Sequence, residues 1–172
     1  MHGNRDFLFG ADAAARAGCA LLADPTVLHF GAQRWLLSHG DLLCLGDVDY
    51  LRFRAQVRTT SWQADFLAQP LAQRRAVARG LREQSEQRKR SGASYADVDA
   101  GMTQDWLRTA GAATLIHGHT HKPADHQLDA GQRRLVLSDW DAAATPARAE
   151  VLRLSLDQGA VQIRRLAASQ AG

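Results

Sequence analysis

The stretch Ala112-Ala113-Thr114-Leu115-Ile116-His117-Gly118-His119-Thr120-His121 decides the fold. Its first half is short and apolar, which is typical of a strand buried inside a sheet. Its second half places two imidazoles one residue apart, where alternating side chains can point to neighbouring ligand positions. Side chains just beyond a buried strand project into the crevice where α/β proteins bind ligands. We therefore expect an α/β fold with a metal-binding loop after this strand.

A second histidine follows another apolar run, nearer the first residue. Trp35-Leu36-Leu37 leads into Ser38-His39-Gly40-Asp41, and Gly3-Asn4-Arg5-Asp6 lies upstream of both. A single histidine after a strand is more often a hydrogen-bonding residue than a ligand. Three histidines in two glycine-flanked loops, with an asparagine near them, favour a metal site instead. Imidazole, amide and carboxylate groups suit manganese, iron or zinc.

The charged neighbours of these loops suggest phosphoryl chemistry. Arg5 offers a planar guanidinium to phosphate oxygens, although a surface salt bridge to Asp6 is an equal alternative. We expect Asp6 and Asp41 to hold an imidazole or Arg5 in position. Nucleophilic serine or cysteine chemistry is poorly supported, because no Gly-x-Ser-x-Gly occurs, and Cys44 is expected to pack near the loop.

Composition limits the classes of protein that this chain can belong to. Its 172 residues are 45% hydrophobic and 23% charged, which fits one folded domain over 1–172 and differs from the composition of a disordered chain. The two cysteines form no Cys-x-x-Cys pair, so neither a disulfide framework nor a thiolate zinc site is expected. No apolar run has the length of a membrane span. We expect a cytoplasmic protein.

The pattern of residues predicts helices and strands in a mixed order. A helix is expected over 7–17, ending at Gly18, and a wholly helical segment over 47–92, broken at Pro70. We interpret that segment, extended to about 47–99, as a helical cap inserted into the domain. A further short helix over 104–109 ends at Gly111. The expected strands are 27–30, 34–38, 114–116, 127–128, 135–137, 151–156 and 161–166.

Positive charge gathers in the helical segment. Residues 51–92 hold ten Arg or Lys against three acids, within a chain whose net charge is only +3. A basic amphipathic helix favours phosphates, anionic lipid head groups or nucleic acid, and a plainly solvated face is equally compatible. A nucleic-acid-binding module is the weaker hypothesis, because aromatic residues are 6% of the chain and none alternate with these charges to stack on bases.

The order of the motifs resembles one known family. Gly3-Asn4-Arg5-Asp6, His39-Gly40-Asp41, the basic helical segment with Tyr50-Leu51-Arg52-Phe53-Arg54, Ile116 to Pro123, and Ser138-Asp139-Trp140 follow one another as in UDP-2,3-diacylglucosamine diphosphatases. These are calcineurin-like metallophosphoesterases of lipid A synthesis. The resemblance spans nearly the whole chain and implies a calcineurin-like sandwich with an inserted helical cap.

The resemblance also implies roles for single residues. Asn4, His39 and His119 correspond to ligands of one Mn²⁺ ion, His121 to a ligand of a second Mn²⁺, and Arg5 to the catalytic arginine. The substrate-binding residues implied are Asn4, Arg5, Asp47, Ser85, Lys89 and His119.

The family's activity would be hydrolysis of the pyrophosphate of UDP-2,3-diacylglucosamine to UMP and 2,3-diacylglucosamine 1-phosphate by metal-activated water. The cap would hold the acyl chains of this lipid substrate. Its basic face would rest on an anionic membrane, which implies a cytoplasmic enzyme peripherally bound to the inner membrane. The oligomeric state stays open, and nucleic acid is not an expected partner.

The sequence departs from the family at its beginning. Family members start with a strand ending in Asp-x-His and continue to a Gly-Asp motif whose aspartate bridges both metals, and neither motif occurs here. We expect a sandwich incomplete at the N-terminus, with unpaired strand edges and a second metal site reduced to His121. The alternative function is a truncated, catalytically inactive fragment that binds metal and lipid.

Overall fold

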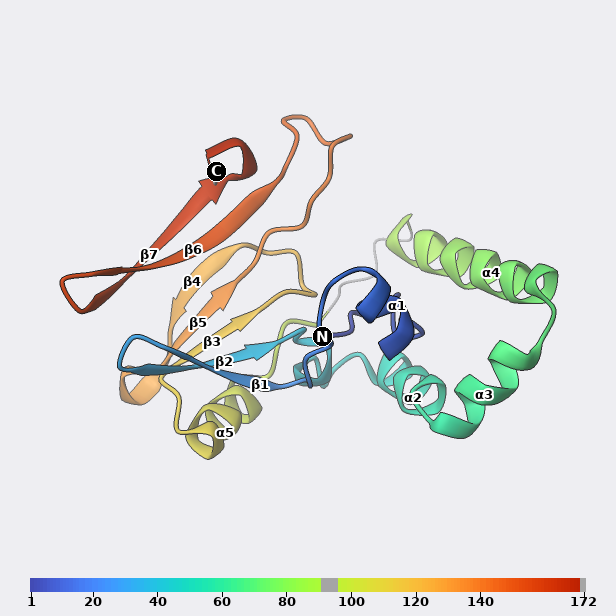
Figure 1. The fold of residues 1–172 in the computed structure, drawn as a ribbon, viewed down its shortest axis with the longest axis horizontal. Coiled ribbons are helices and arrows are strands. Elements are labelled where there is room, and N and C mark those ends of the chain that lie inside the picture. Colours follow the sequence, from blue (N-terminus) through green and yellow to red (C-terminus); the bar gives the residue numbers. More distant parts are fainter. Residues whose placement is uncertain (91–95, 171–172) are drawn as a thin grey trace. The chain divides into compact units, whose positions relative to one another are not determined.

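The chain forms two compact units (Figure 1). The structure, a computed structural model, describes residues 1–90 and 96–170, and the side chains of Glu86, Arg88, Lys89 and Arg90 also lie outside the description. The first unit comprises Met1–Cys44 and Val98–Gly172, and the second is Leu45–Asp97.

A mixed five-stranded sheet forms the centre of the first unit, in the order β1-β2-β3-β5-β4. Strands β2, β3 and β5 run parallel to one another, and β1 and β4 are antiparallel edge strands. This arrangement confirms the expected α/β class. The strands are β1 (Thr26–Phe30), β2 (Gln33–Ser38), β3 (Thr114–His117), β4 (Ala124–Gln127) and β5 (Arg133–Val136).

Strand β3 occupies the middle of this sheet because it is apolar on both faces. All of its residues are buried, and Ile116 stands in register between Leu37 of β2 and Leu135 of β5. Such continuous burial is characteristic of a strand covered on both sides. The apolar run in the sequence therefore predicted the central strand correctly.

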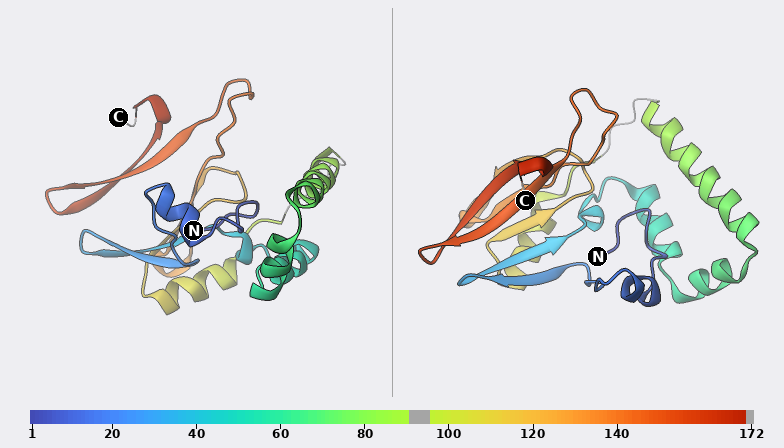
Figure 2. Two further views of the ribbon diagram at one scale, coloured as in Figure 1. Left: turned by 45° about the vertical axis from the view of Figure 1, so that its right-hand side comes forward. Right: turned by 45° about the horizontal axis from the view of Figure 1, so that its top comes forward.

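Each face of the sheet has its own apolar cluster. On one face α5 (Ala100–Ala110) brings Leu107 against Leu36 and Leu115. On the other face lies the antiparallel hairpin of β6 (Glu150–Asp157) and β7 (Ala160–Ala167), whose apolar side chains pack with Trp35 and Ile116. Figure 2 shows α5 and the hairpin on opposite sides of the sheet. Burying a leucine completely contributes about 1.5–3 kcal/mol, so these clusters fix β2 and β3 from both sides.

The helices of the first unit differ in length from the prediction. Helix α5 begins several residues before the predicted start because the Asp99 carboxylate accepts a hydrogen bond from the Met102 amide (2.7 Å) and caps it. It ends at Gly111, whose φ is +59°, as predicted. The helix expected over 7–17 is only α1 (Ala11–Arg16), since Gly10 is extended. Short 3₁₀ turns occupy Asp41–Leu43 (η1), Asp129–Gly131 (η2) and Ala168–Gln170 (η3).

Helices make up most of the second unit, as predicted for 47–92, and residues 91 and 92 of that prediction lie outside the described part of the chain. The Thr59 side chain caps the start of α3 by accepting a hydrogen bond from the Trp62 amide (3.3 Å). The Trp62 and Phe66 rings stack with their centroids 4.9 Å apart. Within the described part of the chain, no helix is both long and apolar enough to span a membrane. The helices are α2 (Val48–Val57), α3 (Thr60–Ala68) and α4 (Leu71–Arg90).

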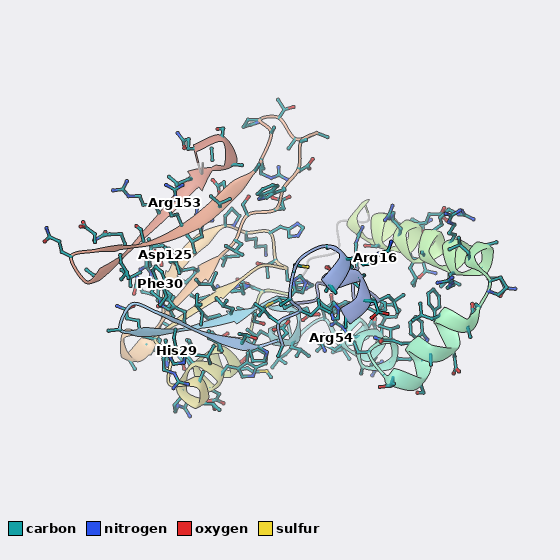
Figure 3. The ribbon with its side chains drawn as sticks, in the orientation of Figure 1. Arg16, His29, Phe30, Arg54, Asp125 and Arg153 are labelled. Atoms are coloured by element: carbon teal, nitrogen blue, oxygen red, sulfur yellow. The ribbon has the colours of Figure 1, made fainter. Side chains whose placement is uncertain are left out.

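An ion pair joins the edge strand β4 to β5. The Arg133 guanidinium donates through Nε to Asp125 Oδ1 (2.7 Å) and through Nη2 to Oδ2, and Figure 3 marks Asp125 on the sheet. These hydrogen bonds hold the pKa of Asp125 below its usual value and raise the pKa of Arg133. The Asp125 side chain is 42% exposed, so solvent screens much of the interaction.

We predict that Asp125→Asn lowers the free energy of unfolding at pH 7 by about 0.2–1 kcal/mol. Because the folded pKa is depressed, this contribution is present above the unfolded value near 4 and is lost as pH falls through the folded value. Urea unfolding at pH 7 and near pH 2 measures both limits. Asp157→Asn, on the exposed end of β6, is the control and should have no effect. A difference for Asp125→Asn that persists unchanged near pH 2 would contradict the prediction.

Candidate metal centre

The parallel pairing of β2 and β3 brings His39 and His119 together. Ser38 and His117 stand in register at the ends of the two strands, and the Gly118 amide then donates a hydrogen bond to the His39 carbonyl (3.1 Å). Beyond this point His39 Nε2 lies 3.2 Å from His119 Nδ1. The two rings meet edge to face, with centroids 5.0 Å apart and planes at 73°.

The loop that carries His119 has an unusual backbone. His119 and His121 have φ values of +65° and +54°, in the left-handed region that few residues other than glycine adopt. The Thr120 amide donates to the Gly118 carbonyl (2.8 Å) and closes a tight turn around His119. Such conformations cost about 1–3 kcal/mol each and concentrate at functional sites.

Gly40 and His117 form the floor of the loops. Gly40 has φ +100°, and a Cβ there would lie 2.8 Å from His117 Nδ1, so only glycine fits against this ring. His117 is fully buried and donates from Nδ1 to the Gly118 carbonyl (2.9 Å). It therefore supports the loop from within the core.

Asp24 anchors His39, a role that the sequence did not reveal. Its Oδ1 accepts a hydrogen bond from the Ser38 hydroxyl (2.7 Å), and its Oδ2 accepts one from the His39 amide (3.2 Å). The Ser38 hydroxyl oxygen in turn accepts a bond from the Gly40 amide (3.0 Å). Asp24 lies well upstream of His39 without a motif around it, so no local signal connects the two residues.

The N-terminal segment reaches the same place. A Cβ at Gly3 would come within 3.3 Å of His39 Cε1, and Figure 2 shows the N-terminus beside the end of β2. Asn4, next to Gly3, is partly buried, whereas Arg5 and Asp6 are exposed. Asp41, also expected to support the site, is fully buried at the start of η1.

His121 lies in a different environment from His119. Its side chain is 60% exposed, and its Nδ1 is 3.7 Å from Asp139 Oδ2. Arg148 donates hydrogen bonds to Asp139, which hold the pKa of that carboxyl below its usual value. Over residues 1–90 and 96–170, no three His, Cys, Asp or Glu side chains gather as a metal-binding group.

The remaining predicted residues belong to the second unit. Asp47 is buried immediately before α2, and Ser85 is partly buried in α4. Lys89 is also in α4, but its side chain is outside the described part of the chain.

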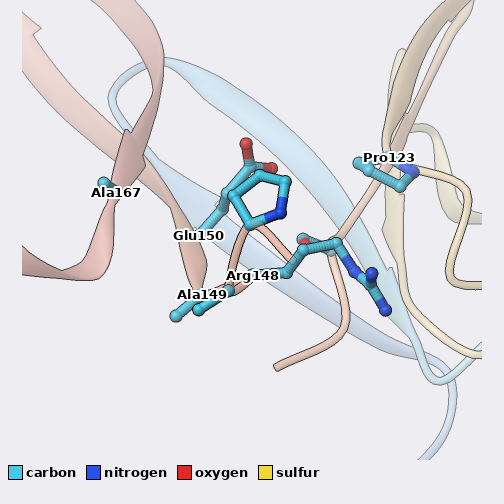
Figure 4. Close-up of a pocket in the computed structure, with 8 residues that line it drawn as sticks. Pro123, Arg148, Ala149, Glu150 and Ala167 are labelled. Atoms are coloured by element: carbon cyan, nitrogen blue, oxygen red, sulfur yellow. The ribbon is translucent and has the colours of Figure 1, made fainter. Parts of the chain in front are cut away.

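A small hollow of about 270 Å³ lies in the first unit, beside the loop that follows β5. Figure 4 shows Pro123 on one side and Ala167 on the other, with Arg148 and Glu150 between them. Its walls are mostly alanine and proline side chains. Its polar lining residues are Ser138, Arg148 and Glu150, and this small, mostly aliphatic lining gives it little of the character of a catalytic pocket.

The His39 and His119 pair has the spacing of two ligands of one divalent ion. A Zn²⁺ ion, for example, bound tetrahedrally to imidazole nitrogens at about 2.0–2.1 Å would place neighbouring ligand nitrogens about 3.3 Å apart. The observed 3.2 Å between Nε2 and Nδ1 agrees with that separation. These two nitrogens can therefore hold a metal ion. Asn4 directly follows Gly3, which lies against the His39 ring, so its side-chain amide is a candidate for a further ligand.

We predict that Asp24→Ala weakens Mn²⁺ binding by about 10–100-fold, because the His39 amide and Ser38 hydroxyl lose the carboxylate that positions them. Titration followed by the electron paramagnetic resonance signal of free Mn²⁺ measures the change. Asp12→Ala, on exposed α1, is the matched control. Unchanged affinity in a folded Asp24→Ala protein would show that Asp24 does not organise the site.

Comparison with known proteins identifies relatives. No family model matches the chain. It is 49% identical over 142 residues to UDP-2,3-diacylglucosamine hydrolase of Chromobacterium violaceum, covering 81% of this chain and 60% of that protein. The protein of the same name in Chromohalobacter salexigens is 50% identical over 81% of this chain and 58% of its own length.

The relative in Stenotrophomonas maltophilia strain R551-3, also named UDP-2,3-diacylglucosamine hydrolase, is 43% identical over 173 residues, covering 91% of this chain and 68% of that protein. The chain thus spans about three-fifths of the length of the first two relatives. Among solved structures, vacuolar protein sorting 29 of Cryptosporidium parvum matches 85% of this chain and 57% of its own at 14% identity and a TM-score of 0.37, which is too low to bear on the fold. The sequence relationships show that the chain belongs to the UDP-2,3-diacylglucosamine hydrolase family.

Proposed function

We propose that this chain hydrolyses the pyrophosphate bond of UDP-2,3-diacylglucosamine, giving UMP and 2,3-diacylglucosamine 1-phosphate. The proposal includes a calcineurin-like metallophosphoesterase sandwich as the finer description of the mixed sheet and the hairpin that packs on it. The relatives whose names give the substrate support it.

The observation that carries the proposal is the 3.2 Å approach of His39 Nε2 to His119 Nδ1 at the ends of two parallel strands. Two imidazole nitrogens at this separation suit one divalent ion, and Asn4 follows the glycine that contacts the His39 ring. Bound there, Mn²⁺ would lower the pKa of a water molecule and polarise a phosphoryl oxygen.

The chain's own residues orient the substrate in this proposal. Arg5, exposed beside Asn4, would donate to phosphate oxygens, where a guanidinium stabilises the charge that builds in the transition state. Asp24, through Ser38 and the His39 amide, keeps the His39 ring at the strand end. His121 would contribute to a second Mn²⁺ site, for which the described residues supply only part of the ligands.

We extend the proposal to the second unit. Asp47, Ser85 and Lys89 would bind the glucosamine nucleotide, as the family resemblance implies. Several large apolar side chains of this unit are exposed and would hold acyl chains. The exposed Arg75, Arg79 and Arg82 of α4 would rest on anionic lipid, placing the protein in the cytoplasm at the inner membrane. Among the described residues of this unit, the exposed large apolar ones are Leu45, Val48, Leu67, Leu71, Val77 and Leu81.

The proposal predicts that the chain releases UMP from UDP-2,3-diacylglucosamine when Mn²⁺ is added. His39→Ala and His119→Ala should each lower the rate of release at least about 100-fold, because each removes a ligand of the ion that activates water. Chromatography of the nucleotide product measures the rate. His29→Ala is the control, because His29 is an exposed histidine on β1 (Figure 3) and should leave the rate unchanged.

Two other results of this assay would contradict the proposal or favour its alternative. UMP release that survives chelation of the metal, or that is unaffected in His39→Ala, would overturn the proposed chemistry. Mn²⁺ and lipid binding by the chain without UMP release would favour the alternative of an inactive metal- and lipid-binding fragment.

A further inference from the structure

The loop that follows β5 is closed by its own backbone. Asp141 and Arg148 exchange two backbone hydrogen bonds, of 2.9 and 3.0 Å, and form an isolated bridge at the base of the loop. The Asp141 carboxylate also accepts a bond from the Ala143 amide (2.9 Å), and the Trp140 indole donates to the Glu150 carbonyl (2.9 Å). These hydrogen bonds therefore fix the position of the Arg148 backbone, from which its side chain extends.

Arg148 fixes the orientation of the Asp139 carboxylate. Its Nε donates to Asp139 Oδ1 (2.9 Å) and its Nη2 to Oδ2 (2.7 Å), while Asp141 Oδ2 is 3.4 Å from the same Nη2. Two parallel bonds from a planar guanidinium define the plane of a carboxylate as well as its position. The Asp139 side chain is only 16% exposed, so it has little freedom to turn to other partners.

The oriented carboxylate faces His121. Asp139 Oδ2 is 3.7 Å from His121 Nδ1, which is an ion-pair distance. The His121 side chain is exposed, and Asp139 is the charged group that lies beside its ring in the described part of the chain. Packing therefore contributes little to the direction of this imidazole, and Asp139 is the group placed to set it.

We propose that Asp139, held by Arg148, is a positioning residue that directs His121 Nδ1 toward its carboxylate and leaves Nε2 to a metal ion. The ligand role of His121 rests on the proposed function. Histidine ligands are commonly oriented by a carboxylate on the second ring nitrogen, and loss of that partner weakens metal binding. Both Asp139 oxygens already accept bonds from Arg148, which suits a positioning residue better than a metal ligand.

A second Asp–Arg pair, on the five-stranded sheet, provides a matched control. Asp125 and Arg133 form the same two-pronged contact on β4 and β5, whereas the carboxylate beside His121 belongs to Asp139. Removing Asp125 breaks a comparable ion pair without removing the carboxylate beside His121. Effects shared by both pairs are therefore structural, and effects confined to Asp139 report on His121.

The first measurement is the tautomer of His121 in the metal-free 172-residue chain, observed by long-range ¹H–¹⁵N NMR at a pH where the ring is neutral. His121→Gln identifies the signals. We expect the proton on Nδ1 in the natural sequence and in Asp125→Ala. In Asp139→Ala it should move to Nε2, the tautomer that isolated imidazole prefers. Arg148→Gln, which keeps the carboxylate but frees it, should shift the population in the same direction.

The second measurement is Mn²⁺ affinity by titration. Asp139→Ala should weaken binding at least about 10-fold, whereas Asp125→Ala should bind like the natural sequence. Equal losses in the two variants would overturn the inference, because they would report a general loss of structure. A proton on Nε2 in the natural sequence, or an Nδ1 proton retained in Asp139→Ala or in a folded Arg148→Gln, would overturn it as well.

The two proposals fail separately. If the natural sequence releases no UMP, the proposed function fails, but the tautomer of His121 still decides whether Asp139 orients the ring. If UMP is released while the tautomer is insensitive to Asp139, the function stands and the positioning role is rejected.

Discussion

The parallel pairing of β2 with β3 is the constraint on which the rest of the structure depends. Because the strands run in the same direction, the residues that follow them emerge at one edge of the sheet, and His39 and His119 become neighbours. An antiparallel pairing would place them at opposite edges. The two apolar clusters, one under α5 and one under the β6–β7 hairpin, maintain this pairing by covering both faces.

Those parts of the fold and site that depend on local pattern could be predicted from the sequence. The apolar runs before His39 and His119 are strands, and Gly111 ends α5 in the left-handed conformation. These features follow from hydrophobic periodicity and backbone preference within a few residues. The mixed α/β class follows from the same signals, because the chain contains both strand-like apolar runs and segments with helical periodicity.

The parts that depend on distant partners could not be predicted. Asp24 supports His39 from a segment with no motif. The hydrogen bonds from Arg148 to Asp139 join two ends of a loop whose shape the sequence does not specify. The expectation that the His119 and His121 side chains would point to neighbouring ligand positions assumed an extended backbone. Positive φ values at both residues replace that alternation, so one ring faces His39 and the other faces Asp139.

The long sequence interval between the paired histidines has a consequence for the newly made protein. His39 and His119 are 80 residues apart, and the whole of Leu45–Asp97 is synthesised between them. Contacts across so long an interval form only after the entropy of closing the loop has been overcome. The two imidazoles therefore come together only after β3 has left the ribosome and joined β2, whereas the N-terminal segment and β2 are made long before.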